Sequence, residues 1–436
     1  MGDYDADVYD LVGIGFGPAN LSLAVAVAEY NTGPGAQTPV TARFLERQES
    51  FGWHRGMLIP DARMQVCFLK DLATPRNPTS PFGFLSYLAD RGRFADFLNR
   101  QTFFPTRLEF HDYLVWAADR VPVAVDYATT VTEVTDAGDQ GGEPVLEVRA
   151  HHDSRPLTLR ARNVVIATGL EPRLPDGVEP SERVWHSSEL MPRVAKLLTG
   201  PAPRRFVVVG AGQSAAECVE YLHRTFDDAE VCAVFSRWGY SPADDSCFAN
   251  RVFDPGAVDE YYQAPPEVRD QVRRVHHNTN YSAVDPDLIQ ALYERHYAER
   301  VAGRERLRFL KVSTVEEYTE TEEAVQVRVR SGIDGTVATL DADALVYATG
   351  YRARDPARLL PGLTVARDEA GRPQVGRDYR LVVEGTAAGI YLQGATEHSH
   401  GLSSTLLSNA AIRAGEILDS VLARRAAPAP VPLGGR

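Results

Sequence analysis

The stretch from Val8 to Tyr30, VYDLVGIGFGPANLSLAVAVAEY, constrains the fold more than any other, because a glycine cluster separates two apolar runs. The first run is typical of a buried strand, and residues 20–30 are typical of a helix. The turn between them contains Gly13, Gly15 and Gly17, which lets peptide N–H groups at the start of the helix face a pyrophosphate. We therefore predict a strand–turn–helix unit that binds a dinucleotide.

A signal peptide or a membrane span is the alternative for this stretch, since residues 11–28 carry no charge. Neither fits, because Asp3, Asp5 and Asp7 make the preceding segment acidic rather than basic, and the glycines with Pro18 would break a spanning helix. Pro18 also occupies the place of the third glycine in GxGxxG, so this motif alone is a weak indication of a dinucleotide site.

The composition favours a small-molecule partner. The chain has 436 residues, enough for two or three domains, and its 46 basic and 59 acidic residues give a net charge of -13. This charge argues against a nucleic acid or an anionic membrane surface as partner. The four cysteines form no CxxC pair and no spaced cluster, so we expect no metal site and no disulfide framework, only the reduced thiols of a cytoplasmic protein.

A second strand, ARFLE at residues 42–46, follows the first helix and ends in an acid, Glu46. In a βαβ dinucleotide site the acid at this position binds a ribose hydroxyl. A solvated charge at a strand end is the alternative. We expect Glu46 to contact the first nucleotide.

An irregular segment rich in aromatic and polar side chains follows at residues 51–81. Aromatic and methionine side chains can flank a planar ring while amide and ammonium groups donate hydrogen bonds, so this segment is a candidate wall of a binding site. Irregular packing on the core is an equally good reading of the composition. The candidate residues are Trp53, His54, Met64, Gln65 and Lys70.

The sequence FVVVGAGQSAAECVE, residues 206–220, repeats the opening pattern and matches the dinucleotide fingerprint better. Its turn contains Gly210 and Gly212. The next strand, over residues 230–237, ends in Ser-Arg where a site for NAD would place an acid, and Arg237 suits the 2′-phosphate of NADPH. A surface cation is the alternative for Arg237. Two glycine turns predict two dinucleotides, for which the usual division is FAD in the first site and NADPH in the second.

We therefore expect an α/β fold with two Rossmann-like dinucleotide-binding domains and a smaller, mostly helical substrate-binding region. Two further buried strands, at residues 163–169 and 344–350, both end in Ala-Thr-Gly, and the pattern over 121–148 predicts a β-hairpin. The expected ranges are 1–170 and 345–423 for the FAD domain, 200–240 and 305–344 for the NADPH domain, 241–304 for the substrate-binding region, and 424–436 for a disordered tail.

Several longer blocks are more specific than the glycine turns and extend over nearly the whole chain. They are DLVGIGFGPANLSLA, FGWHRGMLIPDARMQVCFLKDLATPRNPTSPF, GAGQSAAE, DDSCFANRVFDP, HHNTNYSAVD, YATGY and TEHSHGLSSTLLSNAAIR. In these blocks the chain resembles the bacterial and fungal flavin-dependent N-hydroxylating monooxygenases, the L-ornithine and L-lysine side-chain amine hydroxylases of siderophore biosynthesis. Pro18 is part of that family's pattern.

The resemblance implies where the cofactors and the substrate bind. The FAD site would include Gly13, Gly15, Gly17, Pro18, Asn20, Gln65, Val131, Thr405, Leu406 and Leu407, and the NADPH site Gly212, Gln213, Ser214 and Arg237. The substrate site would include Lys70 and Asn280 at the carboxylate, Asn250 at the backbone end and Ser408 near the side chain, with Gln65 and Phe253 beside them. We expect Lys70, Asn280 and Ser214 to matter most for the reaction. From the residues alone, a solvated cation for Lys70 and turn residues for the two asparagines are the alternatives.

The resemblance also implies the activity, an FAD- and NADPH-dependent monooxygenase that hydroxylates the side-chain amine of L-ornithine with dioxygen. L-Lysine and the diamines putrescine and cadaverine stay open as substrates, because one methylene changes binding by only ~1 to 3 kcal/mol. A Baeyer–Villiger-type flavin monooxygenase is a further alternative, although its FxGxxxHxxx motif is not evident, and so is a flavoprotein that only binds or senses. Since such hydroxylases are commonly tetramers, the resemblance implies a homotetramer.

Overall fold

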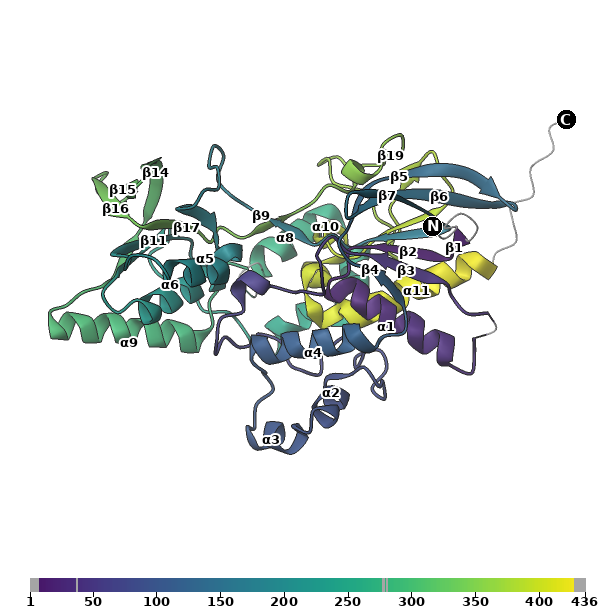
Figure 1. Cartoon of the computed structure of the whole chain (residues 1–436), viewed down its shortest axis with the longest axis horizontal. Helices are drawn as coiled ribbons and strands as arrows, with labels where there is room; N and C mark the ends of the chain where they lie inside the picture. The colour runs from purple at the N-terminus through teal and green to yellow at the C-terminus, as the bar shows by residue number, and fades with distance from the viewer. Residues whose placement is uncertain (1–7, 37, 277–278, 280, 427–436) are drawn as a thin grey trace.

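The computed structural model describes residues 8–36, 38–276, 279 and 281–426. Its main feature is a pair of five-stranded parallel sheets in separate parts of the molecule (Figure 1). Four strands follow the same order in both sheets, whereas the outer strand beside them is the last of its sheet in the chain in one case (β21) and the first in the other (β10). In both sheets the strand before the glycine turn is central, and the strand that follows the next helix lies beside it. The two Rossmann-like domains expected from the sequence are therefore confirmed.

The first sheet is built around β2 (Leu11–Ile14), which leads into the opening glycine turn. Because side chains alternate across a strand, Leu11 packs on helices on one face, whereas Val12 packs on a β-meander on the other. Helices α1 (Pro18–Thr32) and α11 (Ala410–Ala426) lie side by side on the helical face. The strand order is β21 (Gly389–Leu392), β8 (Asn163–Ile166), β2, β3 (Ala42–Leu45) and β4 (Ala124–Asp126), and the meander is β5 (Thr129–Gln140), β6 (Glu143–His152) and β7 (Arg155–Ala161), with β1 (Val8–Tyr9) beside β7. β5 and β6 confirm the hairpin predicted over 121–148.

The second sheet repeats this plan around β11 (Arg205–Val209). Val208 packs on the helical face and Val207 on the face of a second meander. The strand order is β10 (Val184–His186), β17 (Ala344–Tyr347), β11, β12 (Glu230–Phe235) and β13 (Leu307–Lys311). The meander is β14 (Ser313–Glu320), β15 (Val325–Ser331) and β16 (Val337–Ala342), and the helices are α5 (Leu190–Leu197), α6 (Gln213–Thr225) and α9 (Pro286–Ala302).

Three of the expected boundaries need correction. The range 345–423 begins inside β17, which pairs with β11 in the second sheet, so the first domain resumes only after Tyr347. Helix α9 packs against α6 and β13, so the range 241–304 is divided between the second domain and helices α7 (Pro255–Gln263) and α8 (Pro266–His276), which contact α10 (Glu397–His400) of the first domain. Helix α11 continues through Ala426, and residues 427–436 of the expected tail lie outside the described residues.

Two short strands connect the domains. β9 (Leu170–Pro172) and β18 (Tyr351–Ala353) pair antiparallel, and each directly follows one of the two Ala-Thr-Gly motifs. They lie between the two sheets in Figure 1. The chain therefore passes out of and back into the first domain through one paired ribbon.

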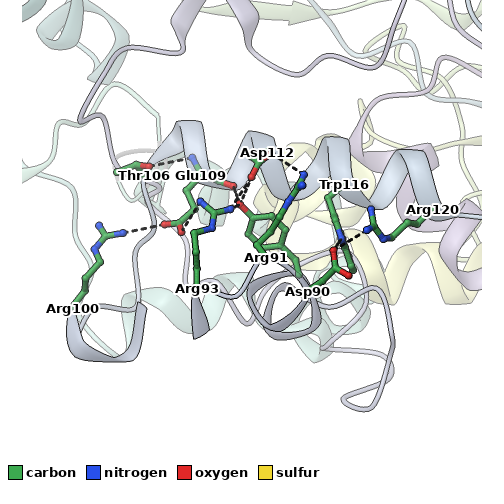
Figure 2. Close-up of polar contacts among 10 residues, drawn as sticks. Asp90, Arg91, Arg93, Arg100, Thr106, Glu109, Asp112, Trp116 and Arg120 are labelled. Carbon is green, nitrogen blue, oxygen red and sulfur yellow. Dashed lines mark hydrogen bonds and ion pairs between the residues drawn. The ribbon is translucent and has the colours of Figure 1, made fainter. Parts of the chain in front are cut away.

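Helices α2 (Phe84–Asp90) and α3 (Phe94–Asn99) fold against α4 (Arg107–Arg120) on the outside of the first domain (Figure 2). Buried aromatic rings from all three helices form the contact, and ion pairs at its rim join Arg93 to Asp112 at 2.8 Å and Arg100 to Glu109 at 3.0 Å. Such exposed pairs stabilise by less than about 1 kcal/mol each, so the rings provide most of the stability. Within the described residues no helix has the length and apolar character needed to span a membrane.

Candidate active site

The first glycine turn is shaped for close approach of a ligand to its backbone. Gly15 has φ +85°, and a Cβ there would lie 2.5 Å from the carbonyl oxygen of Ala167. Gly17 is the N-cap of α1, no side chain caps the helix, and the space beside Gly17 is open. Pro18 at the first helical position lacks an N–H that the helix would leave unpaired anyway. The remaining N–H groups of the first turn are free to bind an anion.

Asn20 fixes the conformation of this turn. Its side-chain amide is fully buried and donates to the carbonyl oxygen of Gly15 at 2.7 Å. Gly13 lies in β2, directly before the turn. The asparagine of the family pattern therefore acts on the turn itself.

The second glycine turn repeats this geometry. Gly210 has φ +142°, a Cβ there would collide with the carbonyl oxygen of Ala348, and Gly212 is the N-cap of α6 without a side-chain cap. Ala167 and Ala348 begin the two Ala-Thr-Gly motifs, and their N–H groups bond the last carbonyls of β2 and β11 at 2.9 and 2.8 Å. The two motifs thus pack directly on the two turns, which explains why the sequence repeats them.

Glu46 lies at the end of β3 beside the first turn and is 5% exposed. Its carboxylate accepts the N–H of Phe16 at 2.7 Å and that of Gln48 at 2.9 Å. It is therefore not a solvated charge at a strand end. Val131 lies half-buried in β5, the neighbouring strand of the meander, at a β-bulge.

The segment from Gln393 to Ser408 has an unusual density of unpaired polar atoms. Both side-chain polar atoms of Gln393 and the hydroxyls of Thr396, Ser404 and Ser408 are buried without a hydrogen-bond partner in the described structure. Buried polar groups are normally paired, so this cluster fits the edge of a polar heterocycle such as a flavin. Thr405, Leu406 and Leu407 lie half-buried within the same segment.

The irregular segment 51–81 lies against α4. Trp53 packs on Phe110 with ring centroids 6.0 Å apart, and Met64 is buried, whereas Gln65 is exposed. Lys70 is half-buried, and no ion pair engages its ammonium within the described residues. An unpaired, half-buried cation suits the carboxylate of a substrate.

His54 lies where this segment meets the ribbon between the domains. It adopts a left-handed conformation with φ 50°, and its ring centroid is 6.4 Å from that of Tyr351. His54 is exposed at the surface, yet desolvation by the protein groups around its ring and the nearby Arg107 lower the pKa of His54 to about 4. The ring is therefore neutral at physiological pH.

The structure brings several predicted substrate residues together. The carbonyl of Phe253 accepts from Asn409 at 3.1 Å, which places the turn that contains Asn250 beside Ser408. Asn250 itself donates to the carbonyl of Asp245 at 2.8 Å. No described contact joins Lys70 to this group, and Asn280 lies outside the described residues.

Tyr281, next to the predicted substrate residue Asn280, contacts the segment 393–408. Its hydroxyl lies 2.5 Å from that of Thr405. Tyr281 therefore contacts the segment that contains the unpaired polar atoms.

In the second domain, Gln213 is held at the start of α6. Its amide donates to Glu217 at 2.9 Å and accepts the N–H of Asp285 at 2.8 Å. Glu217 in turn forms a buried ion pair with Arg107 of the first domain at 2.8 Å. Sequence reasoning missed this pair, because no local pattern marks two residues that are 110 positions apart.

Ser214 follows Gln213 in the first turn of α6, and Arg237 follows β12 with its guanidinium donating to the carbonyl of Ser282 at 2.8 Å. A cavity of about 780 Å³ opens at the same edge of the sheet. It is lined by the glycine turn, the end of β12, the start of β14, the loop 175–178, Tyr347 and Thr349. The volume and position fit the adenosine half of a dinucleotide.

Comparison with known proteins decides the family. The chain matches the family model of L-lysine 6-monooxygenase/L-ornithine 5-monooxygenase over residues 7–353. The chain belongs to this family. Among similar members, the L-ornithine N(5)-monooxygenase of Burkholderia cepacia is 41% identical, with 90% of each chain covered. The L-ornithine N(5)-monooxygenase of Pseudomonas aeruginosa is 36% identical, with 95% of this chain and 94% of that protein covered.

Solved structures of family members share the whole fold. The Kutzneria sp. 744 ornithine N-hydroxylase KtzI, determined as KtzI-FADred-NADP+-L-orn, has a TM-score of 0.91 and 46% identity, covering 96% of this chain and 100% of that chain. The L-lysine 6-monooxygenase of Pseudomonas syringae has a TM-score of 0.81 and 32% identity, covering 95% and 99%. The resemblance inferred from the sequence blocks is therefore confirmed.

Proposed function

We propose that this chain is an FAD- and NADPH-dependent monooxygenase that hydroxylates the side-chain amine of L-ornithine with dioxygen. The observation that carries the proposal is the end-to-end likeness to KtzI, whose structure holds both cofactors and L-ornithine. L-Lysine is the second candidate because the chain also resembles a lysine monooxygenase, but at 32% rather than 46% identity. The hydroxylated ornithine would serve a hydroxamate siderophore or a related product.

The residues present fit the two cofactors. The first turn and Glu46 would hold the pyrophosphate and a ribose of FAD, and the unpaired hydroxyls of Ser404 and Ser408 would face its ring. Gly212, Ser214 and Arg237 would hold NADPH. When bound, the cofactors supply the reducing equivalents and the activation of dioxygen.

The protein's own task is to orient the substrate, exclude water and keep its side-chain amine neutral. A free alkyl ammonium has a pKa of about 10.4, and burial lowers it because the charged form loses hydration. Lys70 and Asn280 would hold the substrate carboxylate, and Asn250 would bind the backbone end of the amino acid. This arrangement would leave the side-chain amine free to point toward the unpaired hydroxyls of the segment 393–408.

The proposal is tested with a panel of L-ornithine, L-lysine, putrescine, cadaverine and a ketone. We expect FAD-loaded protein to convert L-ornithine into a product one oxygen atom heavier, and the other compounds much less. Hydroxylation of L-lysine alone would move the chain to the second candidate, and oxidation of the ketone alone would contradict N-hydroxylation.

We infer that the chain is cytoplasmic and forms a homotetramer. NADPH is a cytoplasmic reductant, and the four cysteines are free thiols. For assembly, one surface of the first domain exposes several large apolar side chains around α3, beside the charged groups of Figure 2. The most exposed are Phe103 at 62% and Leu98 at 55%. Exposed apolar side chains gathered on one surface favour contact with another protein, so we infer that this surface pairs with a second copy of itself across a two-fold axis.

A charged residue introduced into this surface is expected to convert the tetramer into dimers. A tetramer with two kinds of two-fold interface falls to a dimer when one kind fails, so Phe103→Glu should give half the wild-type mass in light scattering while keeping its flavin. Ile333→Glu, which changes an equally exposed side chain of the second domain, should leave the mass unchanged. A monomeric wild-type protein, or an unaltered Phe103→Glu variant, would contradict the assignment.

A further inference from the structure

The two domains can be compared residue by residue, because their main-chain hydrogen bonds correspond. The N–H at the start of each glycine turn donates to the neighbouring strand, to Leu45 O at 2.8 Å in the first domain and to Val234 O at 3.0 Å in the second. The residues that follow these acceptors, Glu46 and Phe235, therefore occupy equivalent positions. Phe235 is 4% exposed and packs in the core, so no acid occupies this position in the second domain.

The equivalence continues to the edge where an adenosine would lie. Ala128 donates to Gln48 O and Val312 donates to Arg237 O, both at 2.8 Å, and both donors have φ 50°. The β-meander strand that starts next has a bulge at the same place in the two domains. Lys311 is the last residue of β13, and Arg237 lies two residues beyond the end of the neighbouring strand β12. Both residues therefore lie at the edge of the sheet that corresponds to the adenosine edge of the first site.

The side chain of Lys311 packs on the ring of Trp238 at this edge. Its Nζ lies 3.4 Å from the ring centroid of Trp238, which is 69% exposed. Within the described residues no acid pairs with it, although the net charge of the chain is -13. Only three residues of the chain are lysines, and the other lysine of this domain, Lys196, forms an ion pair with Glu182.

We propose that Lys311, positioned over the indole of Trp238, binds the 2′-phosphate of NADPH together with Arg237, and that this pair selects NADPH over NADH. The proposal rests on the function proposed above. The phosphate needs charged donors, and Arg237 offers those that Ser241 and Ser282 do not occupy. Trp238 acts as a positioning residue, since a cation over an indole face is attracted to it and loses side-chain freedom.

The test is a calorimetric titration of oxidised, FAD-loaded protein with NADP+ and with NAD+, which needs no turnover. For Lys311→Met we expect NADP+ to bind at least about tenfold more weakly, because one charge-assisted contact is lost, whereas NAD+ binding is unchanged. Lys311→Arg should restore most of the NADP+ affinity. Lys196→Met is the matched control and should bind both nucleotides as the wild type does. Trp238→Phe should weaken NADP+ binding by a smaller factor.

Unchanged NADP+ affinity in Lys311→Met, or equal weakening of NADP+ and NAD+, would overturn the role of Lys311. If the wild-type protein converts L-ornithine but binds NAD+ as tightly as NADP+, only this inference fails. If the wild-type protein binds neither nucleotide, the proposed function fails with it.

Discussion

Replacing Gly15 with alanine is expected to give protein that purifies without flavin. The added Cβ would lie 2.5 Å from the carbonyl oxygen of Ala167, and the φ of +85° is strained for any residue with a side chain. Because Ala167 directly follows the neighbouring strand β8 and is hydrogen-bonded to Ile14, the turn must move away from the position that fits a pyrophosphate. The flavin absorbance of the purified protein, relative to its protein content, measures the loss.

The second turn provides the matched variant. Gly210→Ala should keep its flavin but lose binding of NADP+, since the same collision occurs with Ala348 in the other domain. Gly92→Ala, with φ +67° and open space around the new Cβ, controls for the conformational strain alone and should keep both nucleotides. Loss of flavin in Gly210→Ala, or full flavin content in Gly15→Ala, would contradict the assignment of FAD to the first turn.

Replacing Lys70 with alanine is expected to raise the KM for L-ornithine by about 30-fold or more while leaving the flavin content intact. Removal of one partner of a desolvated, hydrogen-bonded charge pair costs about 2–5 kcal/mol, and here the substrate carboxylate would lose its cation. Steady-state kinetics with L-ornithine and the flavin absorbance measure the two quantities. Lys196→Ala removes a lysine that pairs with Glu182 on the surface and should leave both unchanged. An unaltered KM would contradict binding of the substrate by Lys70 and would favour the alternative of a solvated cation.

The parts of the fold that the sequence predicts are those set by local pattern. The glycine turns, the strands before them and the hairpin over 121–148 follow from apolar periodicity and turn residues within short windows. The role of the Ala-Thr-Gly motifs did not follow, because it depends on Ala167 and Ala348 packing against turns far away in the chain. The misplaced boundary at 345 has the same cause, since only pairing with β11 shows which sheet contains β17.

The candidate site also contains some residues that local pattern predicts and others that it does not. Glu46 and Arg237 follow from their places at strand ends, and the composition of the segment 51–81 makes Lys70 a candidate. The role of Lys70 at the substrate carboxylate, and the choice of Asn250 and Ser408, came from the resemblance, because an isolated polar residue in a loop carries no local signal. The buried pair of Arg107 and Glu217 was not predicted at all. Contacts between distant segments determine these features, and one sequence does not reveal them.

The measurement that tests the central claim most directly is the mass of the product formed from L-ornithine by FAD-loaded protein with NADPH under isotopically labelled dioxygen. We predict one labelled oxygen atom on the side-chain nitrogen, and no product when NADPH or L-ornithine is left out. Oxidation of NADPH without any hydroxylated amine, for L-ornithine and for every other amine of the panel, would contradict the claim.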